Sequence, residues 1–363
     1  MSDTAAARPG LDKKKSIILG ALGLFVIVII FVRVIPQIGS YHDAIASLKA
    51  MSTGALVYIV VSVVVYLAAY GLPFMAAAPG LRYWRSQQLN QAAFAISNGV
   101  PAGGAFGLGV QYAMLTSYGI QPTVSTAAIT AVGVWSIFVT LGLPILGVVA
   151  IQLSGQTATS YVWPGVLGLL VLGFAIVGFA LIVRSESAAR HIGSAGDRLV
   201  SPLTRRFSSG RDVDLEPAAL QFRSDIAGLV TQRWSLITGA QLSVSVFQFF
   251  VFYVALRGVE GWGSAGTALL VAFGSFAVAQ IGLMIPITPG GLGTVDAGMI
   301  AILTALGVDS GAATAADLVW RAASFAPQII IGVIALITWS SRNARALALG
   351  DPAGREGTGG ASV

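Results

Sequence analysis

The sequence predicts an all-α, polytopic membrane protein with seven or eight transmembrane helices and two broken, re-entrant segments related by an internal repeat. Of its 363 residues, 55% are hydrophobic and only 10% are charged, whereas a soluble globular domain carries about 25% charged residues. Long apolar runs recur along the chain, and a helix of about 20 such residues crosses the hydrocarbon core. Two of these runs contain clustered proline and glycine, which disfavour a continuous helix.

The first expected helix covers residues 16–32 and follows a disordered, cytoplasmic N-terminus at residues 1–15. Three lysines at positions 13–15 precede it, and positive charge favours the cytoplasmic side of a membrane. No small-residue cleavage site follows closely, so we interpret this run as a retained helix rather than a signal peptide. A second helix is expected at residues 54–78, with a kink at Pro73.

No charged residue occurs over residues 86–183. This span is expected to hold a broken segment at 91–119 and helices at 123–152 and 161–183. A cytoplasmic linker at 184–233 follows, with eight arginines against six acidic residues. Its positive balance is suited to contact with anionic headgroups, although a solvated connector that obeys the positive-inside rule has the same composition.

The C-terminal part is expected to contain a second broken segment at 286–307 and to complete a transmembrane domain of residues 16–340. Residues 341–363 are expected to form a disordered tail, because the sequence there is small and polar. The remaining helices are predicted at 234–256, 264–285 and 313–339.

The second broken segment has an unusual sequence, IPITPGGLGTVDAG, from Ile285 to Gly298. Non-helical backbone at membrane depth persists only where protein buries it or water lines it. Residues 294–306 form a piece too short to cross alone, which favours a half helix. Transporters often place their binding sites at such breaks.

The two broken segments resemble each other. Residues 101–136 align without a gap on residues 289–324, and ten of the 36 positions are identical. Both stretches contain a break, a short apolar helix, a glycine turn and a Thr-Ala-Ala helix start. Paired interruptions of this kind indicate a repeat-built transporter, with the parallel or inverted relation left open. Seven crossings would put the C-terminus outside, whereas Arg342 and Arg345 favour the inside and require an eighth.

Asp296, Asp317 and Arg321 are the ionisable residues that lie deep in apolar sequence. Each costs roughly 2.5–3.5 kcal/mol at a helix centre, so such residues usually face the protein interior and serve function. In the functional interpretation, Arg321 binds a lipid phosphate, helix-start N–H groups assist, and Asp296 meets a cationic headgroup or exchanges a proton. In the structural alternative, Asp317 and Arg321 form a buried pair on one helix face, while Asp296 satisfies a helix N-terminus.

Other candidates shape or line the expected cavity. The glycines and Pro289 of the break set its backbone, and direct ligand contact by that backbone is the second interpretation. Gln280 and Gln328 are further candidates for the cavity wall, although such residues also form hydrogen bonds between helices. The full candidate substrate-binding set is Arg321, Asp296, Asp317, Thr288, Pro289, Gly290, Gly291, Gly293, Gln111 and Tyr112.

Several function classes lack their sequence signals. There is no cysteine, and the two histidines, His42 and His191, lie in predicted loops without a partner cluster. No hydrolase, zinc-protease, phosphate-loop or dinucleotide motif has the required context. We therefore expect no cofactor and no metal site. We also expect no nucleic-acid partner, because the residues that give the net charge of +6 lie mainly in short loops and tails.

The stretch from Pro286 to Arg321 resembles the lysylphosphatidylglycerol synthase transmembrane-region family, a flippase-like group. The family pattern P-x-(S/T)-P-G-G-x-G-x-x-E, a glycine turn and a helical arginine fall here on Pro286, Thr288, Pro289, Gly290, Gly291, Gly293, Asp296, Gly307 and Arg321. Asn98 and Pro101 match an upstream N-x-x-P-x-G element. Asp296 stands where the family usually has glutamate, and we expect no soluble aminoacyl-transfer domain of the kind that the full synthases carry.

The resemblance implies translocation of a lipid or lipid-linked headgroup between leaflets, without covalent chemistry, in a multi-pass protein of the cell membrane. The expected partners are membrane lipids with anionic phospholipid headgroups, and the resemblance adds a glycosyltransferase of envelope biosynthesis. Two alternatives remain open. One is a membrane-embedded lipid-modifying transferase, which would need carboxylates at a membrane face; the other is a non-catalytic subunit of an envelope assembly complex.

Overall fold

A computed structural model describes residues 49–99, 103–155, 176–191, 215–263, 266–284 and 289–348, together with a few isolated positions. The described residues form helices joined by short turns. No strand occurs in these ranges, which confirms the all-α prediction. The helices are α4 (Thr53–Ala69), α5 (Leu72–Ala77), α6 (Tyr83–Gly99), α7 (Gly103–Ser117), α8 (Pro122–Leu153), α11 (Leu215–Glu260), α12 (Leu269–Ala279), α13 (Thr294–Ala305) and α14 (Ser310–Ala348), with 3-10 helices η2 (Gln280–Met284) and η3 (Pro289–Gly291).

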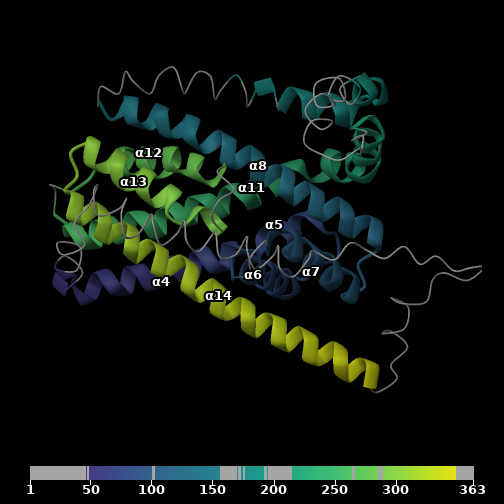
Figure 1. The fold of residues 1–363 in the computed structure, drawn as a ribbon, viewed down its shortest axis with the longest axis horizontal. Helices are drawn as coiled ribbons and strands as arrows, with labels where there is room; N and C mark the ends of the chain where they lie inside the picture. Colours follow the sequence, from purple (N-terminus) through teal and green to yellow (C-terminus); the bar gives the residue numbers. More distant parts are fainter. Residues whose placement is uncertain are drawn as a thin grey trace, which may run out of the picture.

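Four described helices are long and apolar enough to cross a membrane: Thr53–Ala77, Pro122–Leu153, Thr231–Glu260 and Ser310–Arg342. Two shorter apolar helices, Leu269–Met284 and Thr294–Ala305, accompany them. The long helices run side by side along the length of the molecule (Figure 1). The expected first helix at 16–32 and most of that at 161–183 lie outside the described residues.

Helix α4 shows why these sequences suit a bilayer. It begins where the Ser52 hydroxyl accepts a hydrogen bond from the Ala55 N–H (3.2 Å), a usual N-terminal cap. Its buried residues recur at helical spacing and form one stripe: Ala55, Ile59, Val63, Tyr66 and Ala69. The remaining face exposes valines and leucine, as expected where lipid replaces water. The helix ends at Ala69, shortly before Pro73 of α5, where the sequence predicted a kink.

Helix α11 differs from the expected boundaries. It begins at Leu215 and continues to Glu260, so the last part of the predicted linker 184–233 is helical and joins the span directly. Because charged side chains are good or tolerable helix formers at exposed positions, a change from apolar to charged sequence does not by itself end a helix. Helix α14 likewise continues to Ala348, into the predicted tail.

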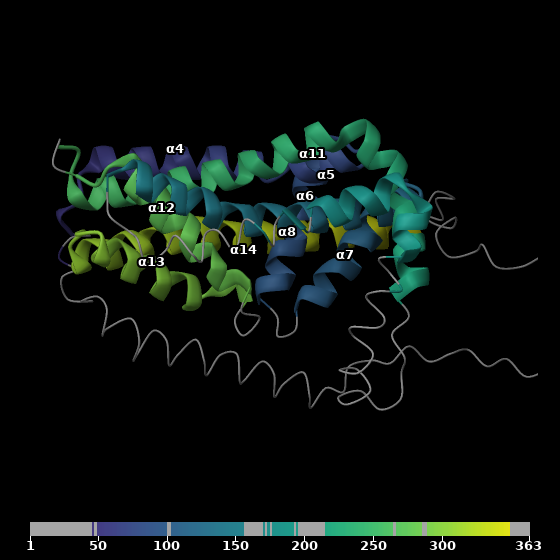
Figure 2. The same cartoon turned by 90° about the horizontal axis from the view of Figure 1, so that it is seen from above.

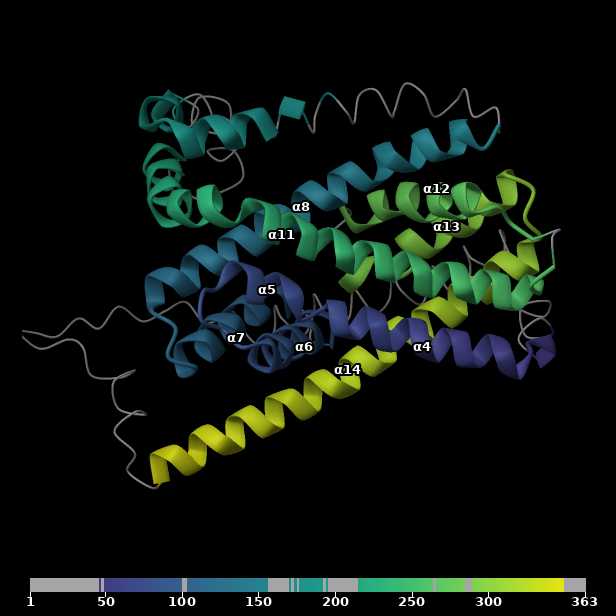
Figure 3. The ribbon, with the colours of Figure 1, turned by 180° about the vertical axis from the view of Figure 1, so that it is seen from behind.

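The two broken segments each form a hairpin. In the first, α6 packs against α7; in the second, α12 and η2 pack against α13. Figure 2 shows that the hairpins approach from opposite ends of the bundle and that their broken ends lie next to each other, midway along the long helices. The same neighbourhood is visible from behind in Figure 3. At this meeting point η3 contacts α6.

The outer turns of both hairpins have the same geometry. Gly119 and Gly307 adopt φ values of +82° and +90°, which favour glycine. The N–H of the following residue bonds to Leu115 O (3.1 Å) in the first turn and to Leu303 O (3.0 Å) in the second. These are the hydrogen bonds of a helix-ending Schellman motif, and the equivalent residues are 188 positions apart in the sequence.

Candidate functional site: a polar chamber where the broken segments meet

A cavity of about 420 Å³ lies where the two hairpins meet; we call it the chamber. It is bounded by α4 to α8, α11, α14 and the 3-10 helices of the second break. Its wall is unusually polar for the interior of an apolar bundle. The polar residues in it are Tyr66, Tyr70, Asn90, Asn98, Gln111, Ser136, Thr140, Gln241, Ser245, Gln248, Gln280 and Arg321.

Some of these polar groups are held by the backbone, and others are free. Asn98 donates its side-chain N–H to Phe94 O (3.0 Å) and Gln241 donates to Val132 O (3.0 Å). Gln111, Gln248 and Gln280 make no side-chain hydrogen bond to another described residue. Because an unsatisfied polar group in apolar surroundings costs several kcal/mol, these amides require water or a polar guest.

Among the described residues that line the chamber, Arg321 is the one cation. Its Nε donates to Asp296 Oδ1, and its two Nη atoms donate to the carbonyls of Gly290 and Gly291 (both 3.3 Å). The guanidinium carbon lies 4.4 Å from the centre of the Trp320 ring and 5.2 Å from that of Phe325. We call this set of contacts the clasp, because it ties α14 to the break and to α13.

The clasp leaves part of the guanidinium available. Arginine has five N–H donors in a planar fork, and the clasp engages one on Nε and one on each Nη. The residue is 8% exposed and borders the chamber. Two N–H groups of the guanidinium therefore remain for a ligand with acceptor oxygens, such as a phosphate.

Asp296 is fully buried and serves two partners. Besides Arg321, its Oδ2 accepts the backbone N–H of Gly293, the N-cap residue of α13. An acidic side chain in the first helical turn satisfies otherwise free N–H groups and suits the positive end of the helix dipole. The negative charge at the N-terminus of α13 thus comes from the side chain of Asp296.

The backbone of the break is built from glycine for a steric reason. Gly290 has φ of +61°, and a Cβ there would lie 2.5 Å from Phe325 Cζ and 2.8 Å from Asn98 Oδ1. Gly290 thus lets η3 fit between α6 and α14 with its carbonyl facing Arg321. The Thr294 hydroxyl donates to Gly282 O (2.9 Å), which fixes η2 against the start of α13.

Asp317 does not pair with Arg321 in the way that the structural alternative expected. The ion-pair partner of Arg321 is Asp296, from a different helix. Asp317 is fully buried, lies beside Asp296 and Arg321, and neither of its oxygens has a hydrogen-bond partner among the described residues. Residues four apart share a helix face, but the neighbouring helix here supplies the better-placed carboxylate.

The other predicted residues are distributed as follows. Gln111 and Gln280 line the chamber. Tyr112 is 40% exposed and is not among the lining residues, while Gln328 is fully buried and accepts a hydrogen bond from the Tyr66 hydroxyl (3.1 Å). Pro289, Gly291 and Gly293 belong to the turn around the clasp, and Thr288 lies outside the described residues.

Sequence reasoning missed the polar residues that α11 contributes. Gln241, Ser245 and Gln248 all line the chamber and recur at intervals of four and three residues, which places them on one face of the helix. This polar stripe within an apolar run was visible in the sequence. Average hydropathy concealed it, because three uncharged residues change the mean of a long run only slightly.

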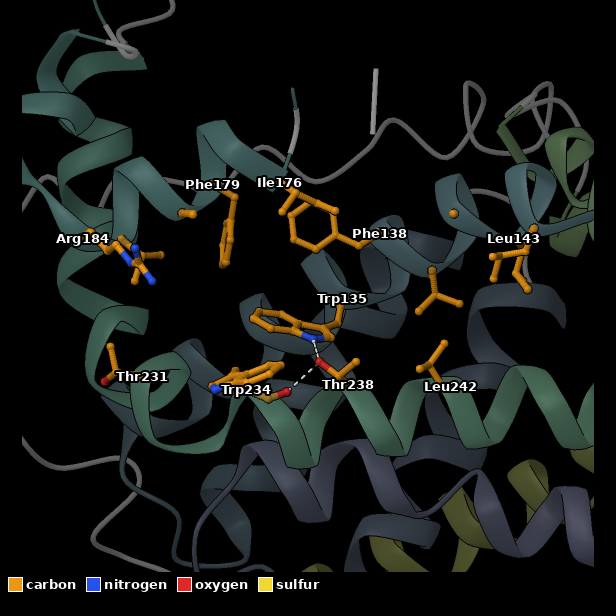
Figure 4. A pocket seen from close by; sticks show the side chains of 15 residues that line it. Trp135, Phe138, Leu143, Ile176, Phe179, Arg184, Thr231, Trp234, Thr238 and Leu242 are labelled. Carbon is orange, nitrogen blue, oxygen red and sulfur yellow. Dashed lines mark hydrogen bonds between the residues drawn. The ribbon is translucent and has the colours of Figure 1, made fainter. Parts of the chain in front are cut away.

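A second cavity, the groove, has about 600 Å³ and a mainly apolar wall from α8, residues 176–184 and α11. Figure 4 shows Arg184 at one end and Leu143 at the other, with aromatic rings between them. The Trp135 indole N–H donates to the Thr238 hydroxyl (2.7 Å), so this polar group is satisfied within the wall. Val139 and Leu143 of α8 line both the groove and the chamber, so the two cavities adjoin.

No group of three or more metal-ligating side chains occurs among the described residues. No curated protein matches the chain. The sequence model of one family, described as "Lysylphosphatidylglycerol synthase TM region", matches residues 17–332. That range contains both hairpins, the chamber and the clasp. The chain is therefore a multi-pass membrane protein that belongs to the lysylphosphatidylglycerol synthase transmembrane-region family.

Proposed function

We propose that the protein moves phosphate-bearing lipid headgroups between the leaflets of a bacterial or archaeal cell membrane, without making or breaking covalent bonds. The observation that carries the proposal is a polar chamber at the midpoint of an apolar bundle, with a guanidinium in its wall. Membership of the family supports a membrane lipid-related role. Free amides and a partly available arginine are the groups that recognise an anionic phospholipid headgroup.

The two adjoining cavities suit the two parts of a lipid. The headgroup phosphate would occupy the chamber and bind the remaining N–H groups of Arg321, while Gln111, Gln248 and Gln280 bind the headgroup oxygens. An acyl chain would remain in the apolar groove, whose wall continues from the chamber at Val139 and Leu143. This arrangement spares the headgroup the cost of contact with hydrocarbon.

The second broken segment can adopt two states, one with the clasp intact and one with the clasp weakened by a bound phosphate. A phosphate competes with Asp296 for the guanidinium, because both are anions that accept its N–H groups. When phosphate binds, the tie between α14 and α13 weakens and the second hairpin can shift relative to the first. The opposite approach of the hairpins supports an inverted repeat, an architecture that exposes a central site to alternate sides. A ligand shifts such an equilibrium only by its different affinity for the two states.

Reconstitution tests this function. Purified protein in liposomes is expected to equalise a headgroup-labelled phospholipid between leaflets, and Arg321→Gln is expected to slow this by at least about tenfold, since a hydrogen bond to a charged group contributes about 1.5–3 kcal/mol. Arg257→Gln is the matched control, because Arg257 is equally buried and ion-paired (to Glu260, 3.6 Å) but does not line the chamber.

A second variant keeps this test valid if Arg321→Gln folds poorly. Gln248→Leu removes a free amide without touching the clasp, and we expect it to slow exchange by several-fold. If well-folded Gln248→Leu and Arg321→Gln both match the wild type, the headgroup does not use the chamber. Chemical change of the labelled headgroup without exchange would instead indicate a lipid-modifying transferase. If the protein neither exchanges lipid nor changes the headgroup, and a glycosyltransferase remains bound on purification, it is an assembly subunit.

The junction of the cavities provides another prediction. Val139→Trp places an indole between groove and chamber, so lipid exchange is expected to fall by roughly tenfold, whereas binding of a tail-free headgroup stays unchanged. Leu153→Trp on the same helix is the control, because Leu153 is strongly exposed and lines neither cavity. Exchange rates in liposomes measure the effect. Unimpaired exchange by folded Val139→Trp would show that acyl chains do not pass this junction.

A further inference from the structure

Asp317 is the least explained ionisable residue in the described part of the chain. Its side chain is fully buried in α14, and neither carboxyl oxygen meets a hydrogen-bond donor among the described residues. An isolated carboxylate in such surroundings is so costly that the group normally becomes neutral by binding a proton. A buried acid without donors therefore needs an explanation that packing alone does not supply.

The charge balance of the cluster points to the same residue. Two carboxyl groups, Asp296 and Asp317, lie beside one guanidinium, that of Arg321. Both oxygens of Asp296 accept N–H donors, from Arg321 and Gly293. Asp317 has no such donors. One proton on Asp317 makes the cluster neutral, and its O–H can then donate toward the carboxylate of Asp296 beside it.

We propose that Asp317 is a proton-binding site that controls anion binding at Arg321. With the proton bound, the cluster carries one guanidinium and one carboxylate, and a phosphate in the chamber can compete for that guanidinium. Without it, two carboxylates face one guanidinium, and a phosphate is repelled. The anionic phosphodiester and the proton are therefore bound together, and by linkage each increases the affinity for the other. The proposal rests on the function proposed above and adds its coupling ion.

Few ionisable groups among the described residues lie beside Asp317. From α13 and α14, Asp296 and Arg321 act on Asp317. From α4, Tyr66 and Tyr70 lie in the chamber wall, and the Tyr66 hydroxyl donates to Gln328. From the interacting helix α11, Arg257 and Glu260 neutralise each other at its C-terminal end. Among these described groups, Asp317 is the acid without a compensating donor.

The test measures binding of two phosphodiesters to the full-length protein from mildly acidic to mildly alkaline pH. The probes are short-chain phosphatidylglycerol and its tail-free headgroup, glycerophosphoglycerol, which both keep one negative charge over this range. Wild-type affinity is expected to fall with rising pH, approaching about tenfold per pH unit for one coupled proton. Asp317→Asn, which is permanently neutral, is expected to bind with a flat pH profile, and Asp317→Glu to restore the slope.

Asp309→Asn is the matched control. Asp309 precedes α14, and its Oδ1 accepts the Ala312 N–H (2.9 Å), so its loss is expected to leave the slope unchanged. A flat wild-type profile, or an unchanged slope in Asp317→Asn, would overturn the proton site while leaving the proposed function intact. Failure of the wild type to bind either probe at any pH would overturn the proposed function. Binding of short-chain phosphatidylglycerol without binding of glycerophosphoglycerol identifies a lipid as the ligand. Equal binding of the two probes identifies a free phosphodiester as the ligand.

Discussion

Arg321→Gln is expected to lower the free energy of unfolding by about 3–5 kcal/mol, the usual cost of removing one partner from a buried ion pair. The variant leaves the buried carboxylate of Asp296 without its guanidinium and frees the carbonyls of Gly290 and Gly291. Equilibrium unfolding in detergent, followed by circular dichroism, measures the loss. The same change removes the cation from the chamber, so stability and transport must be separated.

A double-mutant cycle achieves this separation. Asp296→Asn with Arg321→Gln replaces the ion pair by two neutral amides of similar shape, and the two sites are expected to show a coupling of about 1–3 kcal/mol. Stability should therefore recover in part, whereas headgroup exchange should not. If the double variant is no more stable than the sum of the single effects predicts, the clasp does not hold α14 to the break.

Gly332→Ala is expected to disrupt the packing of α14 on α6 and to destabilise the protein by about 1–3 kcal/mol, as overpacking does. A Cβ at this position would lie 2.1 Å from the carbonyl oxygen of Gln91 and 2.5 Å from Ala95 Cβ. The contact is with backbone, so a change of rotamer cannot relieve it. Because the end of α6 carries Asn98 into the chamber, exchange should fall as well.

Gly239→Ala on α11 is the control for this substitution. No atom lies within 4 Å of the Cβ that it would add, and alanine is the better helix former by about 1 kcal/mol. We therefore expect the control to be as stable as the wild type or slightly more stable in the same unfolding measurement. Equal effects of the two substitutions would mean that α6 and α14 are not in close contact at Gly332.

Much of the fold could be predicted from the sequence, because the bilayer restricts the backbone conformations that a chain can adopt. Apolar runs of about 20 residues are long enough to cross the bilayer as helices, which satisfy their own backbone there, and the proline and glycine clusters then mark breaks in those helices. The glycine turns at Gly119 and Gly307 were likewise readable, since a left-handed residue is needed to end each short helix. Helix ends were less predictable, as α11 shows, because charged residues do not stop a helix.

The site was predictable only in part, for a physical reason. That Asp296, Asp317 and Arg321 are special follows from the cost of charge in hydrocarbon. Which acid pairs with the arginine depends on how α13 folds back on α14 through the turn at Gly307, and helical spacing describes only neighbours within one helix. The same limit applies to the free amides, since α7, α11 and η2, which are far apart in the sequence, bring them together.

The most direct test of the account is to locate a lipid headgroup on the protein. A phospholipid with a photoreactive headgroup is incorporated with the protein in liposomes, and the crosslinked residues are mapped by mass spectrometry. We expect crosslinks at Gln111, Gln248 or Gln280 that excess unlabelled anionic lipid removes. Crosslinks confined to outward-facing residues such as Val60 and Ile334, with none in the chamber, would contradict it.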